Sequence, residues 1–379
     1  MKYNMVILSY HPSALTNWVV KLAPYMKWSQ LSVLHIAKLH GVEAISIEGI
    51  KLYDVSNYSF KQAEKLVKEL NPDLFVFLSF RSVLELTYHR ICTTNHIHKV
   101  YLEHGLFSND TLKFRTNKLK KEFRKTFYRQ FSFAKTQIGY IINSGNVWNE
   151  SKLYMEVFFY KKFKIVPYDH YFLFSRRSFD NYSKLFPMEE GKNVTYIGYP
   201  IFSDEEQKKI ANVHDGGGIL YVHQPLISDG LAKITYDEEK QWLLKISSIL
   251  APQYGTMTIL LHPRANLEDY KKRYEGTGIE VTKAPNNFRL FADKSLIVGH
   301  YSTALLYGLY FEKPTVVLDY PTMNNDSLFS EIFTFVDDLE KLPICNFKVN
   351  SEMKEYMVGN YNTFEHIAHC LNNYVLSFQ

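Results

Sequence analysis

Residues 256–320 read TMTILLHPRANLEDYKKRYEGTGIEVTKAPNNFRLFADKSLIVGHYSTALLYGLYFEKPTVVLDY. This stretch holds three short apolar runs, Thr256–Leu261, Ser295–Val298 and Thr315–Leu318, each followed by polar or turn-forming residues. Short apolar runs separated by helical patterns are typical of buried parallel strands. Polar residues at the carboxyl ends of such strands lie where open α/β sheets bind ligands. The stretch therefore predicts half of an α/β domain with a ligand-binding edge.

The turns that follow these strands favour an anion. The first run leads into His262-Pro263-Arg264, and the second leads through His300 to Ser302 and Thr303, directly before an apolar helical pattern. Hydroxyl groups and free amides at the start of a helix favour a phosphate. We expect this edge to bind a nucleotide.

Length and composition set the class of protein. With 379 residues the chain is long enough for two domains that each bury a core. A net charge of +5 is too small to indicate nucleic acid as a partner. The three cysteines, Cys92, Cys345 and Cys370, have neither disulfide nor metal spacing, and no uncharged apolar stretch is long enough to span a membrane. We expect a cytoplasmic protein, with peripheral contact at the inner face of the bacterial inner membrane.

The first half of the chain alternates strands and helices, which predicts a Rossmann-like domain. The expected strands are Met5–Ser9, Glu43–Ile47, Leu74–Phe80 and Lys99–Leu102. The expected helices are a long one from Ala14 to His40, the amphipathic Phe60–Leu70, and one that ends near Cys92.

A second series of strands begins at Tyr168–Ser175, so we place a domain boundary near residue 165. Residues 1–165 are expected to form an acceptor-side domain and residues 166–355 a nucleotide-sugar-binding domain. Residues 356–379 are expected to form a helical tail that packs back on the first domain. The fold class is then α/β, with two facing Rossmann-like domains and a central cleft.

Residues 113–129 carry eight basic side chains and one acidic side chain, with Leu119, Phe123 and Phe127 spaced as one helical stripe. One interpretation is a solvated surface helix that packs on the core. The other is an interfacial helix that binds an anionic membrane or an anionic glycan. In the second case the contacting residues are basic ones in the middle of the segment: Lys120, Lys121, Arg124 and Lys125.

Four short motifs occur in this order along the chain: Glu103-His104-Gly105, Gly198-Tyr199-Pro200, His262-Pro263-Arg264 and Ser302-Thr303. This set resembles the bacterial sialyltransferases and polysialyltransferases of capsule and lipooligosaccharide synthesis. The resemblance implies a GT-B fold and a glycosyltransferase that uses a CMP-activated nonulosonic acid, such as sialic acid or Kdo. It covers most of the chain in order, although each motif is only two or three residues long.

The resemblance implies that His104 is the general base on the acceptor hydroxyl. The family has an aspartate at this position, and a histidine with an ordinary pKa of about 6.5 also suits base catalysis at neutral pH. Glu103 is a candidate to orient the His104 ring. A histidine here is also similar to Kdo transferases of capsule initiation and to polyol-phosphate polymerases of teichoic acid synthesis. The alternative interpretation is a buried structural histidine at a strand end.

On the donor side, the resemblance implies that His262 holds the CMP phosphate and that Ser302 and Thr303 contact the phosphate or the donor carboxylate. Arg264 would add a bidentate contact. Each also has a purely structural interpretation, as a turn or a helix cap. Further donor-binding candidates lie at strand ends: Gly198, Pro200, His223, Gln224 and His300. Ser9 and His11 follow the first strand and are candidates for the acceptor surface.

Together these features predict an inverting, metal-independent glycosyltransferase that moves a nonulosonic acid from its CMP donor to a glycan or glycolipid acceptor. No sequence motif for a metal or another cofactor is present, and we expect none to be required. One alternative is a CDP-glycerol or CDP-ribitol polyol-phosphate transferase of capsule or teichoic acid synthesis. Another is a non-catalytic CMP-sugar-binding component of a capsule assembly complex.

Overall fold

The chain forms two compact units. The computed structural model describes residues 2–9, 18–40, 46–56, 58–80, 83–105, 142, 147–148, 151, 167–184, 186–200, 216–228, 232–283, 288–300, 302–319, 332–344, 347, 351–360 and 362–378. The first unit comprises Met1–Pro200 together with Met357–Gln379, and the second comprises Ile201–Tyr356. The basic segment 113–129 lies outside the described residues.

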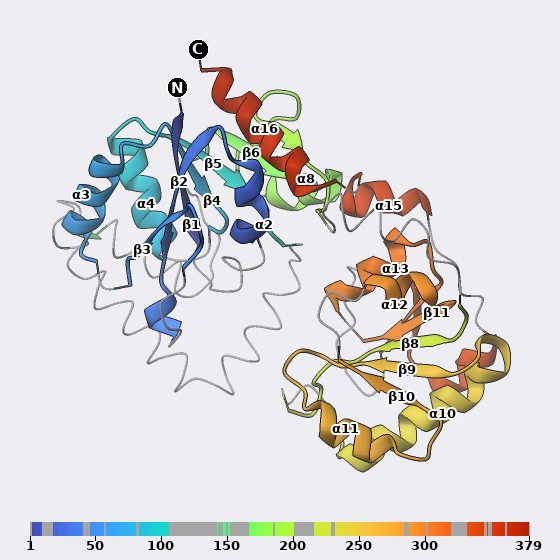
Figure 1. Ribbon diagram of the computed structural model, residues 1–379. Coiled ribbons are helices and arrows are strands. Elements are labelled where there is room, and N and C mark those ends of the chain that lie inside the picture. The colour runs from blue at the N-terminus through green and yellow to red at the C-terminus, as the bar shows by residue number, and fades with distance from the viewer. Residues whose placement is uncertain are drawn as a thin grey trace. The chain divides into compact units, whose positions relative to one another are not determined.

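The first unit is built on a parallel sheet of strand order β3-β2-β1-β4-β5-β6-β7, whose first six strands run across the blue-to-green part of Figure 1. Its strands are β1 Tyr3–Ser9, β2 Ser29–His35, β3 Lys51–Asp54, β4 Leu74–Phe77, β5 His98–Leu102, β6 His170–Leu173 and β7 Val194–Tyr196. Every residue of β4 is buried, as expected for a central strand covered on both faces.

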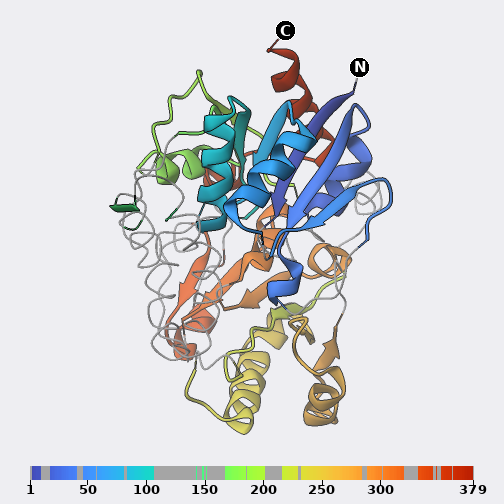
Figure 2. The same ribbon diagram turned by 90° about the vertical axis from the view of Figure 1, so that its left-hand side faces the viewer.

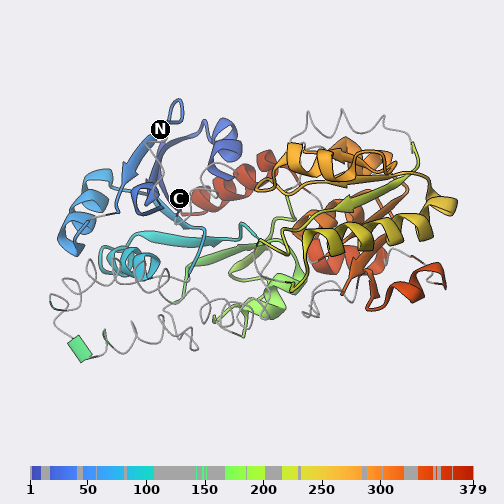
Figure 3. The ribbon, with the colours of Figure 1, turned by 90° about the horizontal axis from the view of Figure 1, so that it is seen from below.

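Helices cover both faces of this sheet. One face packs on α3 Phe60–Leu70, α4 Val83–Thr94 and α8 Arg176–Tyr182, and Figure 2 shows α3 and α4 side by side. The other face packs on α2 Val20–Leu22, its 3-10 extension Ala23–Tyr25, and α16 Phe364–Leu376. The C-terminal helix α16 thus belongs to the first unit, and Figure 3 shows it next to α2.

The second unit is built on a parallel sheet of order β10-β9-β8-β11-β12-β13. Its strands are β8 Ile219–Val222, β9 Met257–Leu260, β10 Glu280–Thr282, β11 Leu296–Gly299, β12 Thr315–Leu318 and β13 Thr334–Val336. Its helices are α10 Tyr236–Tyr254, α11 Leu267–Tyr274, α12 Phe288–Asp293, α13 Leu306–Tyr310 and the start of α15 Ser351–Val358. It also contains 3-10 turns at Thr303–Leu305 and Leu339–Ile344, and the first unit contains one at Ala37–His40. Apolar side chains of α10 and α11 form the core against one face of this sheet.

Three expectations differ from this structure. The predicted long helix from Ala14 to His40 is wrong at Ser29–His35, which is strand β2. Most of the predicted strand Glu43–Ile47 lies outside the described residues, and its last residue, Ile47, is not in a strand. The next strand in the described part of the chain is Lys51–Asp54. Side chains on both faces of β2 are buried, so tertiary packing overrides its helix-like apolar spacing. The boundary also differs from residue 165, because β6 and β7 pair with the first sheet and the first unit continues to Pro200.

The end of β7 is held tightly against the segment that returns from the second unit. The Tyr199 N–H donates to the Val358 carbonyl at 3.0 Å, and the Asn362 side-chain amide donates to a backbone carbonyl at the end of β7. Gly198 has φ +67°, and a Cβ atom there would lie 1.8 Å from the Asn360 carbonyl oxygen. Only glycine therefore fits at position 198.

We predict that Gly198→Ala destabilises the first unit by about 3 kcal/mol, because left-handed backbone strain of about 1–2 kcal/mol adds to the steric overlap. Gly191→Ala is the matched control, since Gly191 has φ +78° and nothing lies within 4 Å of its Cβ position. Thermal unfolding of both variants measures the difference. Equal losses of stability would show that the close approach to Asn360 costs nothing.

Candidate functional site

Three turns meet at the carboxyl edge of the second sheet. The strands β9, β8 and β11 are parallel neighbours in that order. The strands that follow β8 are first added on its β9 side and then, from β11 on, on its other side, so the strand order reverses between β8 and β11. His262 follows β9, His223 and Gln224 follow β8, and Ser302 follows β11. Ligands of open α/β sheets bind at such a switch point, outside the carboxyl ends of the strands. The sheet thus brings together four of the residues that the sequence singled out.

The His262-Pro263-Arg264 turn is ordered by its own backbone. His262 is partly buried and Arg264 is exposed. The Arg264 N–H donates to His262 Nδ1 at 3.2 Å, so the neutral ring carries its proton on Nε2. The turn then presents one imidazole N–H and one guanidinium, both donors that suit a phosphate oxygen.

His223 lies directly behind this turn and is only 2% exposed. Its Nδ1 accepts the His262 backbone N–H at 3.4 Å, and its Nε2 lies 2.9 Å from the Tyr270 hydroxyl. Tyr270 in turn donates to a carboxylate oxygen of the buried Glu239 at 3.1 Å. A side chain enclosed in this way packs in the core, so the structure does not place His223 as a surface contact for a donor. Gln224, next in the chain, is partly buried.

Sequence analysis missed Glu239 and Tyr270, which lie on α10 and α11. A signal was present in the helix pattern: Glu239 falls on the same helical stripe as the buried Trp242, Leu243 and Ile246. A carboxylate on an apolar stripe is rarely fully buried unless it is paired. Its pairing here is with Tyr270.

The turn after β11 contains residues of different kinds. Ser302 is partly buried, and its hydroxyl accepts the Ala304 N–H at 3.3 Å, so it caps the following 3-10 turn. Nothing is described for the Thr303 side chain. His300 is 1% exposed, stacks on Trp242 and bonds the Tyr221 hydroxyl at 3.0 Å, so it occupies a core position rather than a donor-contacting one.

At the edge of the first sheet, Glu103 is completely buried at the end of β5. Its two carboxylate oxygens accept the Phe174 N–H at 2.7 Å and the Ser178 hydroxyl at 2.9 Å. Burial raises the pKa of Glu103 to about 8, and these hydrogen bonds only partly oppose that rise. Glu103 therefore connects the end of β5 to the start of α8. Its two carboxylate oxygens bond to Phe174 and Ser178, which does not support the expected role of orienting His104.

His104 follows Glu103 and is partly buried. Its ring lies nearly perpendicular to that of Trp18, with 6.5 Å between ring centroids, and Trp18 in turn contacts Phe174 and Phe364. Packing against an aromatic ring restricts the orientations that an imidazole can adopt. Ser9, at the end of β1, is 1% exposed, so it lies in the core rather than on a surface that could contact an acceptor.

The remaining candidates fall elsewhere. Gly198 and Pro200 belong to the first unit, where Pro200 forms a parallel bridge with Asn362, and not to the expected nucleotide-binding domain. The tight packing of Gly198 on the returning chain explains that glycine without a nucleobase. The candidates outside the described residues are His11, Lys120, Lys121, Arg124 and Lys125.

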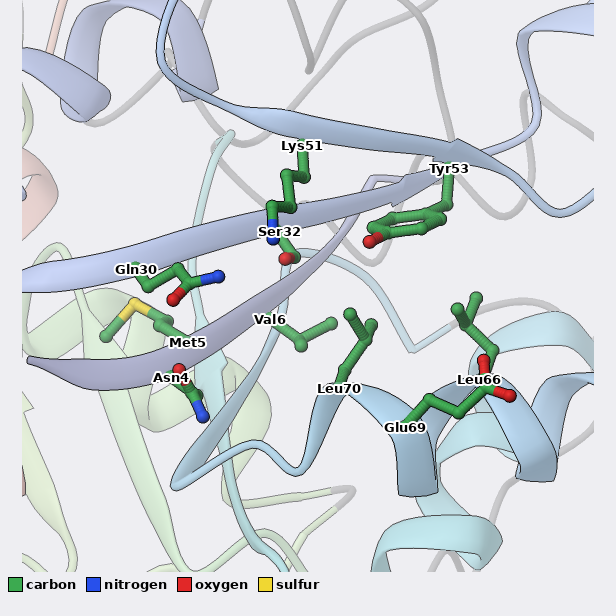
Figure 4. Close-up of a pocket in the computed structure, with 10 residues that line it drawn as sticks. All are labelled: Asn4, Met5, Val6, Gln30, Ser32, Lys51, Tyr53, Leu66, Glu69 and Leu70. Atoms are coloured by element: carbon green, nitrogen blue, oxygen red, sulfur yellow. The ribbon is translucent and has the colours of Figure 1, made fainter.

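Two pockets among the described residues lie at the amino ends of first-unit strands. One, of about 270 Å³, lies between the starts of β1, β2 and β3 and helix α3, and Figure 4 shows Gln30, Lys51 and Glu69 on its walls. The other, of about 440 Å³, lies at the start of β5 beside Asp169 and Tyr374. Across the described residues, no group of three or more His, Cys, Asp or Glu side chains is placed to hold a metal ion, and no helix is long and apolar enough to cross a membrane.

No protein-family model and no curated protein matches the sequence. Solved structures are nevertheless similar over nearly the whole chain. The glycosyltransferase of kitacinnamycin has a TM-score of 0.56 and 11% identity, over 99% of this chain and 100% of that chain. UDP-GlcNAc 2-epimerase from Methanocaldococcus jannaschii has 0.53 and 13%, over 98% and 100%. The spinosyn forosaminyltransferase SpnP has 0.52 and 11%, over 99% and 100%.

Identities this low show the fold alone. The chain has two Rossmann-like α/β domains with parallel sheets, as in GT-B glycosyltransferase structures, and the predicted α/β class with two such domains is confirmed. The same fold also carries an epimerase, so the reaction has to be argued from the side chains at the two sheet edges.

The buried carboxyl group of Glu103 predicts a specific pH dependence of stability. The pKa of Glu103 is raised from 4.5 to about 8, so between these pH values the folded state binds one proton more than the unfolded state. The stability that this proton contributes decreases as pH rises and is lost above pH 8. Wild-type stability should fall between pH 5 and 8 by up to about 1.4 kcal/mol per pH unit relative to Glu103→Gln. Chemical denaturation at several pH values measures the slope.

The control for this slope is Glu190→Gln. Glu190 is on the surface and its pKa is lowered by hydrogen bonds from Tyr196 and Arg176, so it titrates below this window. That variant should keep the wild-type slope. A Glu103→Gln protein with the wild-type slope would show that Glu103 is ionised in the folded protein throughout.

Proposed function

We propose that the protein is a glycosyltransferase whose second unit binds the nucleotide of an activated sugar. The observation that carries this proposal is the turn after β9, where an ordered His262 imidazole and the exposed Arg264 follow a strand next to the switch point. Donors placed there before the reaction stabilise the charge that a departing phosphate gains in the transition state. The GT-B fold agrees with this assignment, since glycosyltransferases with that fold are among the similar structures.

For the donor, we propose a CMP-activated nonulosonic acid, and for the acceptor a cell-surface glycan. The support is the resemblance of the ordered motifs at 103–105, 262–264 and 302–303 to bacterial sialyltransferases. His262 Nε2 would donate to the CMP phosphate while its Nδ1 stays bonded to the Arg264 amide. The partly buried Ser302 hydroxyl would help to bind the phosphate or the donor carboxylate.

In the proposed reaction, His104 in the first unit takes the proton from the acceptor hydroxyl. The acceptor oxygen forms a bond to the anomeric carbon while the bond from that carbon to the phosphate oxygen breaks, and CMP leaves with the electron pair. A single displacement without a covalent intermediate inverts the anomeric configuration. Ring contact with Trp18 holds the His104 imidazole for this step.

A second candidate is a polyol-phosphate transferase that uses CDP-glycerol or CDP-ribitol. The observation that favours it is the histidine at position 104, where sialyltransferases have an aspartate. A third is a nucleotide-sugar-binding protein without catalysis. The nucleotide that binds and the effect of His104 on turnover separate the three.

We predict that millimolar CMP raises the melting temperature of the protein and that CDP and UDP raise it less. A ligand at 100 times its dissociation constant adds about 2.7 kcal/mol to the stability of the folded state. His262→Ala should remove most of the shift, whereas His369→Ala on the exposed side of α16 should retain it. A larger response to CDP would favour the polyol-phosphate transferase, and no response to any of the three nucleotides would end the nucleotide proposal.

We predict that His104→Ala lowers turnover of a CMP-nonulosonic acid by a factor of about 10²–10⁴, the usual contribution of a general base, with CMP binding unchanged. His98→Ala is the matched control, because His98 begins the same strand β5 at its opposite end. Turnover with a panel of CMP-sugars and the CMP-induced shift in melting temperature give the two readouts. Turnover of His104→Ala equal to that of the wild type would remove His104 from the mechanism.

A further inference from the structure

We propose that His223, Tyr270 and Glu239 form a buried relay that positions the His262-Pro263-Arg264 turn. His223 is then a positioning residue that acts through His262 and does not itself touch the donor. The relay is defined by contacts within the second unit. Only its effect on nucleotide binding rests on the function proposed above.

The directions of the hydrogen bonds are determined along the whole relay. Glu239 accepts the Tyr270 hydroxyl proton, so the Tyr270 oxygen accepts in turn from His223 Nε2, 2.9 Å away. With its proton on Nε2, His223 has a lone pair on Nδ1, and that atom accepts the His262 backbone N–H at 3.4 Å. Each member therefore fixes the orientation of the next, and the last bond reaches the backbone of the turn.

The turn is thus held at two points. His223 holds the His262 backbone N–H, and the Arg264 backbone N–H holds the His262 ring at Nδ1. Together these bonds leave Nε2 as the proton-bearing nitrogen of His262 in a defined direction. A rigid donor loses less entropy on binding a phosphate than one that rotates freely.

Burial makes this network costly for a role in stability alone. His223 and Glu239 are 2% and 1% exposed, and isolated buried charges are strongly unfavourable. Arg273 offsets the charge, with its guanidinium 3.9 Å from Glu239 and packed over the Tyr236 and Tyr270 rings. Apolar residues would fill the same space without any need for hydrogen-bond partners or a compensating charge. A buried polar network that ends at the His262 turn therefore indicates a positioning role.

Two substitutions at one position separate positioning from packing. In His223→Asn the side-chain oxygen can occupy the place of Nδ1, so it can still accept the His262 N–H while the bond to Tyr270 is lost. In His223→Gln the amide reaches the place of Nε2, so the bond to Tyr270 is kept and the acceptor for His262 is lost. Both variants remove the imidazole, and thermal unfolding of each measures the shared loss of packing.

The first readout is the ¹⁵N NMR spectrum of histidine-labelled protein without nucleotide, with His262→Ala used to assign the His262 ring. The wild type should show the Nε2–H form of His262. His223→Asn keeps the acceptor but loses the bond to Tyr270 that orients it, so it should show mostly this form, and His223→Gln should show a mixture of tautomers. The second readout is the CMP dissociation constant. His223→Gln should bind CMP about tenfold more weakly than His223→Asn, the effect of one hydrogen bond worth about 1.4 kcal/mol.

The relay would be overturned if His262 gives the same ring signals in the wild type, His223→Asn and His223→Gln. It would equally be overturned if the two variants bind CMP with equal affinity while the wild type binds it more tightly. A wild-type protein that does not bind CMP contradicts the proposed function instead. In that case the NMR comparison still decides whether His223 positions His262.

Discussion

Parallel pairing on both sides of β8 is the constraint from which the candidate nucleotide edge follows. β8 pairs with β9 on one side and with β11 on the other, and neighbouring strands lie ~4.8 Å apart. Parallel strands end at the same edge, so the turns after all three must emerge together. His223 and His262 are 39 residues apart in the chain, yet this pairing brings them within hydrogen-bonding distance. The site is therefore a property of strand order.

Each sheet places a buried glutamate beside the turn that carries a candidate histidine. Glu103 is fully buried next to His104 in the chain, and Glu239 is 1% exposed behind His262. Both carboxyl groups bond to elements other than the histidine: Glu103 to β6 and α8, Glu239 to Tyr270. In both units a buried glutamate, whose burial is unfavourable by itself, bonds to the elements next to the turn. The histidine of each turn remains partly exposed. That division suits a side chain that must meet a ligand.

The sequence allowed those parts of the fold to be predicted in which local pattern and tertiary packing agree. The helix Phe60–Leu70 matches its prediction because an amphipathic stripe and a Ser59–Gln62 capping box mark the same residues. Strand β2 was mistaken for helix because burial on both faces erases the alternation that would mark a strand. The apolar stripe of α10 marks Glu239 as a buried residue. Its contacts with Tyr270 and His223 join different elements, and no local pattern encodes contacts of that kind.

Fold likeness and side-chain chemistry answer different questions about this protein. A transferase and an epimerase are among the structures that share its fold, so two Rossmann-like domains are compatible with more than one reaction on an activated sugar. Both reactions involve a nucleotide-linked sugar phosphate, so the His262 turn alone does not separate them. Transfer also needs a base that takes a proton from a second substrate. The partly buried His104, in contact with Trp18 rather than paired with Glu103, is the residue on which that distinction depends.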